Sequence, residues 1–254
     1  MIKGVICDIG GVLYEGNKPI NGAVEAINKI KQNYQIRFAT NTTRRAPCTI
    51  ISRLKNMGFD IKEEELFTAL AAAKKLVQQN KAKAYTLLTQ DATDYFGDLS
   101  VSKGADFVVV GDAAENFNYS RLNQAFRELL NGAKLIAAAK NRYFKDADGE
   151  LSLDAGPFVE ALEYASGKKA EIVGKPSAKF FQLALDSMGL KAQEVIMVGD
   201  DIESDIAGAQ KAGMKAILVR TGKFKPSDLD KPIWPDEVID SIAQLPEVLT
   251  KFNS

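Results

Sequence analysis

The sequence predicts an α/β fold in which a doubly wound, Rossmann-like parallel sheet carries a second, inserted α/β domain. Two observations support this prediction. Short runs rich in β-branched residues alternate with amphipathic segments, and acidic or hydroxyl residues stand where several of these runs end. Such alternation is typical of parallel strands joined by helical crossovers. Ligands of doubly wound sheets bind outside the carboxyl ends of the strands, so these polar residues are expected to share one crevice.

The predicted core elements lie near both ends of the chain. They are strands at 3–9, 36–41, 194–201 and 215–222, and helices at 23–32, 46–58 and 205–213. The proline-bearing stretch 223–238 is interpreted as an exposed loop before a final helix.

A further α/β stretch separates the two sets of core elements. It contains strand-like segments at 85–88, 106–111 and 134–139, and helix-like segments at 119–132 and 156–167. This pattern predicts a core formed by residues 1–79 and 171–254, with an inserted α/β domain at 80–170.

Composition excludes several classes of function. Lysine plus arginine and aspartate plus glutamate number 33 each, so the chain lacks the basic excess of nucleic-acid binders. It also lacks a secretory signal and an apolar run long enough to cross a membrane, which favours a cytoplasmic protein without a membrane partner. Cys7 and Cys48 form no metal-binding spacing and are expected to be small buried thiols.

The chain contains no histidine. This absence excludes Ser-His-Asp catalysis, Cys-His catalysis and histidine-ligated metals among the chain's own side chains. Any chemistry must therefore use carboxylates, lysines, hydroxyls or a bound metal ion.

Two acidic motifs stand at predicted strand ends. Asp8 leads into Gly10 and Gly11, which allow the backbone to approach a ligand closely. At the end of the strand at 194–201, the segment GDDIESD places Asp200, Asp201 and Asp205 within a short span. Clustered carboxylates favour a cation such as Mg²⁺, although helix capping would account for one or two of the three acids.

Two further motifs suit phosphate binding. Thr40 and Asn41 end a predicted strand and offer a hydroxyl and an amide, although such residues also cap helices. Lys175 lies between Gly174 and Pro176, where its charge could meet an anion.

Along the chain the four motifs follow the order Asp8, Thr40, Lys175 and Asp200. With them in this order, the chain resembles the haloacid dehalogenase superfamily over essentially its whole length. It is most similar to the subclass with a large α/β cap inserted between the threonine and lysine motifs. The resemblance implies a hydrolase, specifically a magnesium-dependent phosphatase in which Asp8 attacks phosphorus to give an aspartyl-phosphate. It also implies metal binding by Asp8, the Gly10 carbonyl and Asp200, with Asp205 and Asp201 orienting the site.

The same resemblance implies that Thr40, Asn41 and Lys175 bind the phosphoryl group of a small substrate under the cap domain. Caps in this subclass often pair, which would give a homodimer. The chain departs from the family at Gly10, where most family phosphatases carry a second aspartate as acid and base. General acid and base catalysis contributes about 10²–10⁴-fold, so the hypothesis is a restricted phosphatase. Pyrophosphate, phosphoramidates and activated esters have leaving groups that need little protonation.

Three other interpretations remain open on the sequence. The chain could be a phosphate-binding or interaction protein that retains the Mg²⁺ site but is catalytically weak or inactive. A dehalogenase fits less well, because a carboxylate-rich metal motif is a feature of phosphoryl transfer. A dinucleotide-binding protein is disfavoured because no GxGxxG follows the first strand.

Overall fold

The computed structural model describes residues 1–145 and 150–253. By its internal contacts the chain divides into two compact units. The first comprises residues 1–40, 51–67 and 175–254, and the second comprises 41–50 and 68–174. The second unit thus takes in more of the chain than the inserted domain predicted at 80–170, whose bounds remain a proposal.

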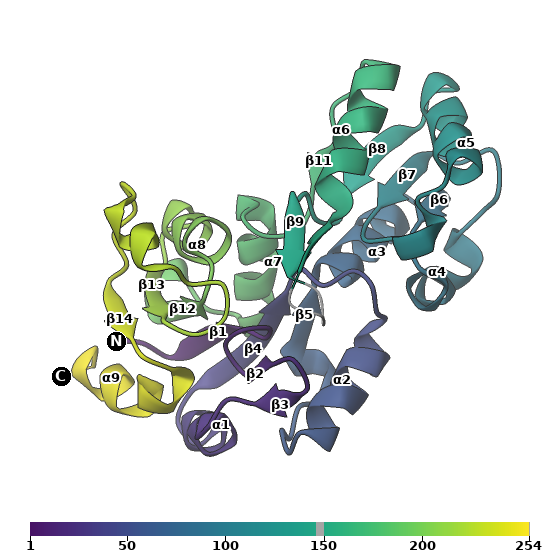
Figure 1. Cartoon of the computed structure of the whole chain (residues 1–254). Helices are drawn as coiled ribbons and strands as arrows, with labels where there is room; N and C mark the ends of the chain where they lie inside the picture. Colours follow the sequence, from purple (N-terminus) through teal and green to yellow (C-terminus); the bar gives the residue numbers. More distant parts are fainter. Residues whose placement is uncertain (146–149, 254) are drawn as a thin grey trace. The chain divides into compact units, whose positions relative to one another are not determined.

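A six-stranded parallel sheet forms the centre of the first unit (Figure 1). Its strand order is β14-β13-β12-β1-β4-β5, with β1 Gly4–Asp8, β4 Gln35–Thr40, β5 Leu66–Thr68, β12 Val195–Gly199, β13 Lys215–Val219 and β14 Glu237–Ile239. All five residues of β1 and of β12 are buried. Such continuous burial is expected of parallel strands covered on both faces.

Helices cover both faces of this sheet. In Figure 1, α7 and α8 lie on one side and α1 and α9 on the other. The helices of this unit are α1 Ala23–Lys31, α7 Ala178–Met188, α8 Gly208–Lys211 and α9 Leu245–Lys251. Helix α2 Pro47–Asn56 is divided between the two units at residue 50. A small antiparallel hairpin, β2 Tyr14–Glu15 and β3 Lys18–Pro19, follows β1.

The second unit has its own four-stranded parallel sheet. Its order is β11-β8-β7-β6, with β6 Ala84–Leu87, β7 Phe107–Val110, β8 Lys134–Ala137 and β11 Glu171–Ile172. An antiparallel pair, β9 Tyr143–Lys145 and β10 Leu151–Leu153, follows β8. The helices are α3 Ala69–Gln79, α4 Gln90–Phe96, α5 Tyr119–Leu130 and α6 Ala155–Ser166.

Shorter helical turns connect these elements. They are η1 Glu63–Glu65, η2 Gly97–Leu99, η3 Ala114–Asn116, η4 Ala192–Glu194, the π-helix η5 Ile202–Ala207, η6 Pro226–Asp230 and η7 Ile242–Gln244. Across the described ranges 1–145 and 150–253, none of the helices combines the length and the apolar character that a bilayer span requires.

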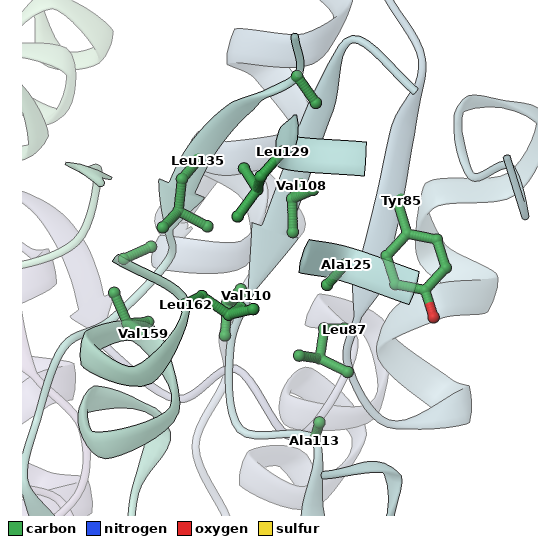
Figure 2. Close-up of a cluster of buried hydrophobic side chains, with 12 residues drawn as sticks. Tyr85, Leu87, Val108, Val110, Ala113, Ala125, Leu129, Leu135, Val159 and Leu162 are labelled. Atoms are coloured by element: carbon green, nitrogen blue, oxygen red, sulfur yellow. The ribbon is translucent and has the colours of Figure 1, made fainter. Parts of the chain in front are cut away.

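A separate hydrophobic core stabilises the second unit (Figure 2). Side chains from β6, β7 and β8 pack against those of α5 and α6, including Val108, Val110, Leu129 and Leu162. Helix α5 begins at an N-cap, where the Asn118 side chain accepts a hydrogen bond from the Arg121 amide. Its periodic apolar residues then face this core, as an amphipathic helix requires.

The predicted α/β fold with a doubly wound core sheet is confirmed, but two local expectations were wrong. The stretch 223–238 is not only a loop, because its last residues begin β14, where Glu237 pairs with Ile217 of β13. Cys7 is buried as expected, whereas Cys48 is exposed.

Two neighbouring leucines of α5 test the importance of the second core. Leu129 is fully buried in it, whereas Leu130 is 61% exposed. We expect Leu129→Ala to lower the free energy of unfolding by about 2–5 kcal/mol, because it leaves a cavity. Leu130→Ala should change it by less than about 0.5 kcal/mol. Urea denaturation followed by circular dichroism compares them, and equal losses would contradict this assignment of the core.

Candidate active site

The candidate site lies where the strand order of the core sheet changes direction. From β1 the chain adds β4 and β5 on one side, and later adds β12, β13 and β14 on the other. Asp8 ends β1, Thr40 ends β4 and Asp200 directly follows β12. The strand registers place Asp8 beside Ala39 and Cys7 beside Val198. These residues therefore meet at the switch point, where open α/β sheets bind ligands.

Three carboxylates converge at this point. Oxygens of Asp8, Asp200 and Asp205 lie within 4.8 Å of one another, and all three residues are buried. Lys175 is 3% exposed and lies among them. Its Nζ donates to Asp8 Oδ1 and, at 3.3 Å, to the carbonyl oxygen of Ala39. If all these groups are ionised, three negative charges and one positive charge leave two negative charges uncompensated.

Asp205 holds Lys175 from the other side. Its Oδ1 lies 2.7 Å from Lys175 Nζ, and its side chain is 1% exposed. Within the described part of the chain, this oxygen accepts no well-directed hydrogen bond, so the contact is an ion pair. Lys175 therefore links the carboxylates of Asp8 and Asp205.

The electrostatics of the cluster follow from burial and crowding. Burial raises the pKa of Asp205 to about 6, because repulsion by Asp8 adds to desolvation while Lys175 only partly offsets them. Burial, followed by repulsion from Asp8 and Asp205, also raises the pKa of Asp200. Burial opposes the charge on Lys175, but the attraction of Asp205 and Asp8 outweighs it and raises that pKa.

The donor set fits a divalent cation. Carboxylate oxygens are the hard ligands that Mg²⁺ prefers, and two uncompensated charges match its valence. Burial and then repulsion raise the pKa values of Asp200 and Asp205, and a cation would relieve the repulsion. Two residues predicted as ligands, Asp8 and Asp200, are thus brought together. The third predicted ligand, the Gly10 carbonyl, remains a prediction.

Asp201 has a different part in the structure from its neighbours. Its Oδ1 accepts hydrogen bonds from the amides of Glu203 and Ser204, which makes it the N-cap of η5. Capping therefore accounts for one acid of the motif, and the triad contains the other two. The π-helical turn η5 places Asp205 against Gly199, where an added Cβ would lie 2.3 Å from Asp205 Cβ. Glycine at 199 is what allows this approach.

Two glycines enclose the carboxylate of Asp200. A Cβ added to Gly11 or to Gly222 would lie 2.0 Å from Asp200 Oδ2. Both glycines have positive φ, of 80° and 69°, which disfavours other residues. The amide of Lys223 donates to the same oxygen at 2.7 Å. Sequence reasoning missed Gly222 and Lys223, and the TGK sequence after β13 was the available signal.

The remaining predicted residues are placed as follows. Thr40 is buried at the end of β4, in the same unit as Asp8. Asn41 is the next residue in the chain but is grouped with the second unit, so its role at phosphate remains a prediction.

Cys7 precedes Asp8, and burial raises the pKa of its thiol, with repulsion by Asp8 adding to the effect. It is therefore an inert thiol and not a competing nucleophile.

Gly10 and Gly11 differ sharply although they are adjacent. A Cβ added at Gly10 would meet no atom of a described residue within 4 Å outside its immediate neighbours, whereas one at Gly11 meets Asp200. We expect Gly11→Ala to destabilise the protein by more than about 1 kcal/mol, because it combines backbone strain with a clash. The matched Gly10→Ala should change stability by less than about 1 kcal/mol. Thermal unfolding of both variants measures this difference, and the reverse order would refute the placement of Gly11.

Two family models match separate parts of the chain. Residues 5–101 match the family described as haloacid dehalogenase-like hydrolase. Residues 172–245 match the family described as HAD-hydrolase-like. The two matches include Asp8, Thr40, Lys175, Asp200 and Asp205.

Curated relatives align with nearly the whole chain. Human phospholysine phosphohistidine inorganic pyrophosphate phosphatase is 40% identical over 98% of this chain and 94% of its own length. Bovine haloacid dehalogenase-like hydrolase domain-containing protein 2 is 45% identical over 91% of this chain and 88% of its own length.

Solved structures are similar over both units. The p-nitrophenyl phosphatase from Archaeoglobus fulgidus has a TM-score of 0.90 and 30% identity, covering 97% of this chain and 99% of that one. NagD from E. coli K-12 has a TM-score of 0.86 and 27% identity, covering 96% and 98%. Together with the near full-length relatives, these similarities show that the chain belongs to the haloacid dehalogenase-like hydrolases and is a phosphatase of that family.

Proposed function

We propose that this phosphatase is magnesium-dependent, acts on small phosphorylated molecules and uses Asp8 as its nucleophile. One observation carries the proposal: the buried Asp8 carboxylate lies in a triad with Asp200 and Asp205, and Lys175 donates to it. A carboxylate needs no deprotonation at neutral pH, which suits a chain without histidine.

Asp8, the Gly10 carbonyl and Asp200 would hold the metal ion. When bound, Mg²⁺ supplies charge neutralisation for the phosphoryl oxygens and for the approaching carboxylate. Asp205 would act by holding Lys175 against Asp8, as their ion pair supports. Lys175 would then hold the Asp8 carboxylate in place and direct positive charge toward the phosphoryl group. Thr40 and Asn41 would donate hydrogen bonds to its oxygens.

The reaction proceeds in two displacements. In the first, a carboxylate oxygen of Asp8 forms a bond to phosphorus while the bond to the leaving group breaks, and the leaving group keeps the electron pair. This step gives an aspartyl-phosphate. In the second, a water oxygen attacks the same phosphorus, the bond to Asp8 breaks, and inorganic phosphate departs with the water's proton released to solvent or to phosphate itself. Asp8 returns to its carboxylate form.

Gly10 determines which leaving groups are favourable. No side chain at this position can protonate a departing alkoxide, so good leaving groups should be preferred. The names of two similar proteins agree with this preference, since one acts on phospholysine, phosphohistidine and inorganic pyrophosphate and another on p-nitrophenyl phosphate. We therefore infer that pyrophosphate, phosphoramidates and activated phosphate esters are the substrates of this chain.

The inserted α/β domain at 80–170, which makes up most of the second unit, is proposed to act as a cap domain. The second unit has its own parallel sheet and hydrophobic core, which supports a separate domain. A cap of this size would admit small substrates and restrict large ones, and pairing of two caps would give a homodimer.

Removing the nucleophile tests the function itself. We expect the unmodified chain to hydrolyse p-nitrophenyl phosphate with Mg²⁺, and Asp8→Asn to reduce kcat by at least about 10³-fold. Asp240→Asn is the matched control, because Asp240 is 70% exposed in its pair with Arg220 and should leave kcat unchanged. Release of p-nitrophenolate followed spectroscopically gives the rates. An unmodified chain without Mg²⁺-dependent turnover, or an active Asp8→Asn variant, would refute the proposal.

Restoring the missing acid tests the role of Gly10. The space around this position admits a side chain, so Gly10→Asp should fold. We expect it to raise kcat/KM for an alkyl phosphate by about 10²-fold and to change that for p-nitrophenyl phosphate far less, because only the alkoxide needs a proton. Gly10→Asn is the control of similar shape without an acid. Equal gains on both substrates, or the same gain from asparagine, would contradict the leaving-group argument.

A further inference from the structure

Three hydrogen bonds join the loop after β13 to the candidate site. Thr221 Oγ1 donates to the carbonyl oxygen of Gly11 at 2.5 Å. The Gly222 amide donates to Glu15 Oε1 at 2.7 Å, and the Lys223 amide donates to Asp200 Oδ2 at 2.7 Å. We call this group of contacts the clasp. It joins the loop 221–223 to residues from two distant parts of the chain.

The clasp surrounds one oxygen of the Asp200 carboxylate, Oδ2. Asp200 Oδ2 accepts the Lys223 amide and lies so close to Gly11 and Gly222 that neither position has room for a side chain. Two consecutive amides of one loop therefore end on two carboxylates, those of Glu15 and Asp200. Because the amides belong to one short segment, displacement of Gly222 also displaces the donor to Asp200.

Two of these hydrogen bonds attach the loop to the segment that follows Asp8. One ends on Gly11 and the other on Glu15. Thr221 is held to Gly11, three residues after Asp8, and Glu15 lies in β2, further along this segment. The loop, this segment and the Asp200 carboxylate thus form one hydrogen-bonded assembly. Sequence reasoning assigned no role to Glu15.

We propose that Thr221 and Glu15 are positioning residues, which fix the Asp200 carboxylate in the orientation that binds a divalent cation. The proposal rests on the proposed function, since it concerns the same metal site. It assigns Glu15 the part of a hydrogen-bond acceptor and Thr221 that of a hydroxyl donor. Neither residue touches the reacting atoms in this account. Residues that orient metal ligands typically contribute about 10–100-fold to metal affinity.

Four substitutions test the donor role of Thr221 and the acceptor role of Glu15 separately. Thr221→Val removes the hydroxyl while keeping the shape, and Thr221→Ser keeps it. Glu15→Ala removes the acceptor, and Glu15→Gln keeps an acceptor oxygen without the charge. Thr250→Val is the matched control, because the Thr250 hydroxyl also donates to a carbonyl, that of Glu247 at 2.6 Å, on the exposed surface of α9.

The primary measurement is the dissociation constant for Mg²⁺ in the absence of substrate, obtained from thermal-shift titrations of the full chain. The Mg²⁺ concentration for half-maximal hydrolysis of p-nitrophenyl phosphate is measured alongside it. We expect Thr221→Val and Glu15→Ala to weaken Mg²⁺ binding by about 10-fold, and excess Mg²⁺ to restore most of kcat. Thr221→Ser and Glu15→Gln should recover most of the affinity, and Thr250→Val should match the unmodified chain.

Several results would overturn the proposal. One is Mg²⁺ binding by Thr221→Val and Glu15→Ala within twofold of the unmodified chain. A second is a loss of kcat that excess Mg²⁺ does not restore. A third is a Glu15→Gln variant as impaired as Glu15→Ala, because the charge of Glu15 would then matter and not its role as a hydrogen-bond acceptor. Should Thr221→Val fail to fold, the two Glu15 variants decide the matter. An unmodified chain that neither binds Mg²⁺ nor hydrolyses p-nitrophenyl phosphate would overturn the proposed function as well. If the unmodified chain does both and the variants match it, only the positioning role of Thr221 and Glu15 is overturned.

Discussion

The excess of negative charge around Lys175 is the constraint on which the rest of the site depends. Asp8, Asp200 and Asp205 are buried together, and a single ammonium group is placed among them. Buried carboxylates repel one another strongly, so this arrangement is costly unless another positive charge joins it. Under the proposed function, a divalent cation would resolve the imbalance, and the phosphoryl substrate would then meet a neutralised site. The excess of buried negative charge that is costly without a cation would thus favour binding of the cation that phosphoryl transfer requires.

The backbone makes this crowding possible. Parallel strands deliver Asp8 and Asp200 to one edge of the sheet from opposite ends of the chain. Glycines then stand where a carboxylate must approach another segment closely: Gly199 beside Asp205, and Gly11 and Gly222 beside Asp200. Gly10 belongs to a different category, because a side chain would fit there and none is present. The effect proposed for it is chemical, on the leaving group, and not steric.

Local sequence patterns predicted the parts of the structure that local physics determines. Buried strands such as β1 and β12 are mostly apolar runs that can be recognised in the sequence. Asp8 and Asp200, at the ends of these two strands, could therefore be expected to lie close together, as they do. The strand β14 was missed because it is short and follows prolines, and its pairing with β13 supplies what its own sequence lacks. Asp205 could not be placed by spacing alone, because the π-helical turn η5 determines its direction.

Contacts between distant segments were beyond prediction for a related reason. The hydrogen bond from Gly222 to Glu15 joins a glycine and an exposed acid, neither of which carries a distinctive pattern. Only the folded core sheet brings them together. Likewise, residues 41–50 lie between two core segments in sequence yet are grouped with the second unit. Their grouping depends on tertiary contacts such as the ion pair between Arg44 and Asp112 at 2.8 Å.

The most direct test of a magnesium-dependent Asp8 nucleophile is chemical trapping of the acyl-phosphate. The chain is quenched in acid during turnover of p-nitrophenyl phosphate, reduced with borohydride and mapped by mass spectrometry. Reduction of an aspartyl-phosphate gives homoserine at that position, whereas a free carboxylate is unchanged. The account predicts homoserine at position 8 when Mg²⁺ is present and none when it is chelated. Turnover with an unmodified Asp8, or trapping at another carboxylate, would contradict it.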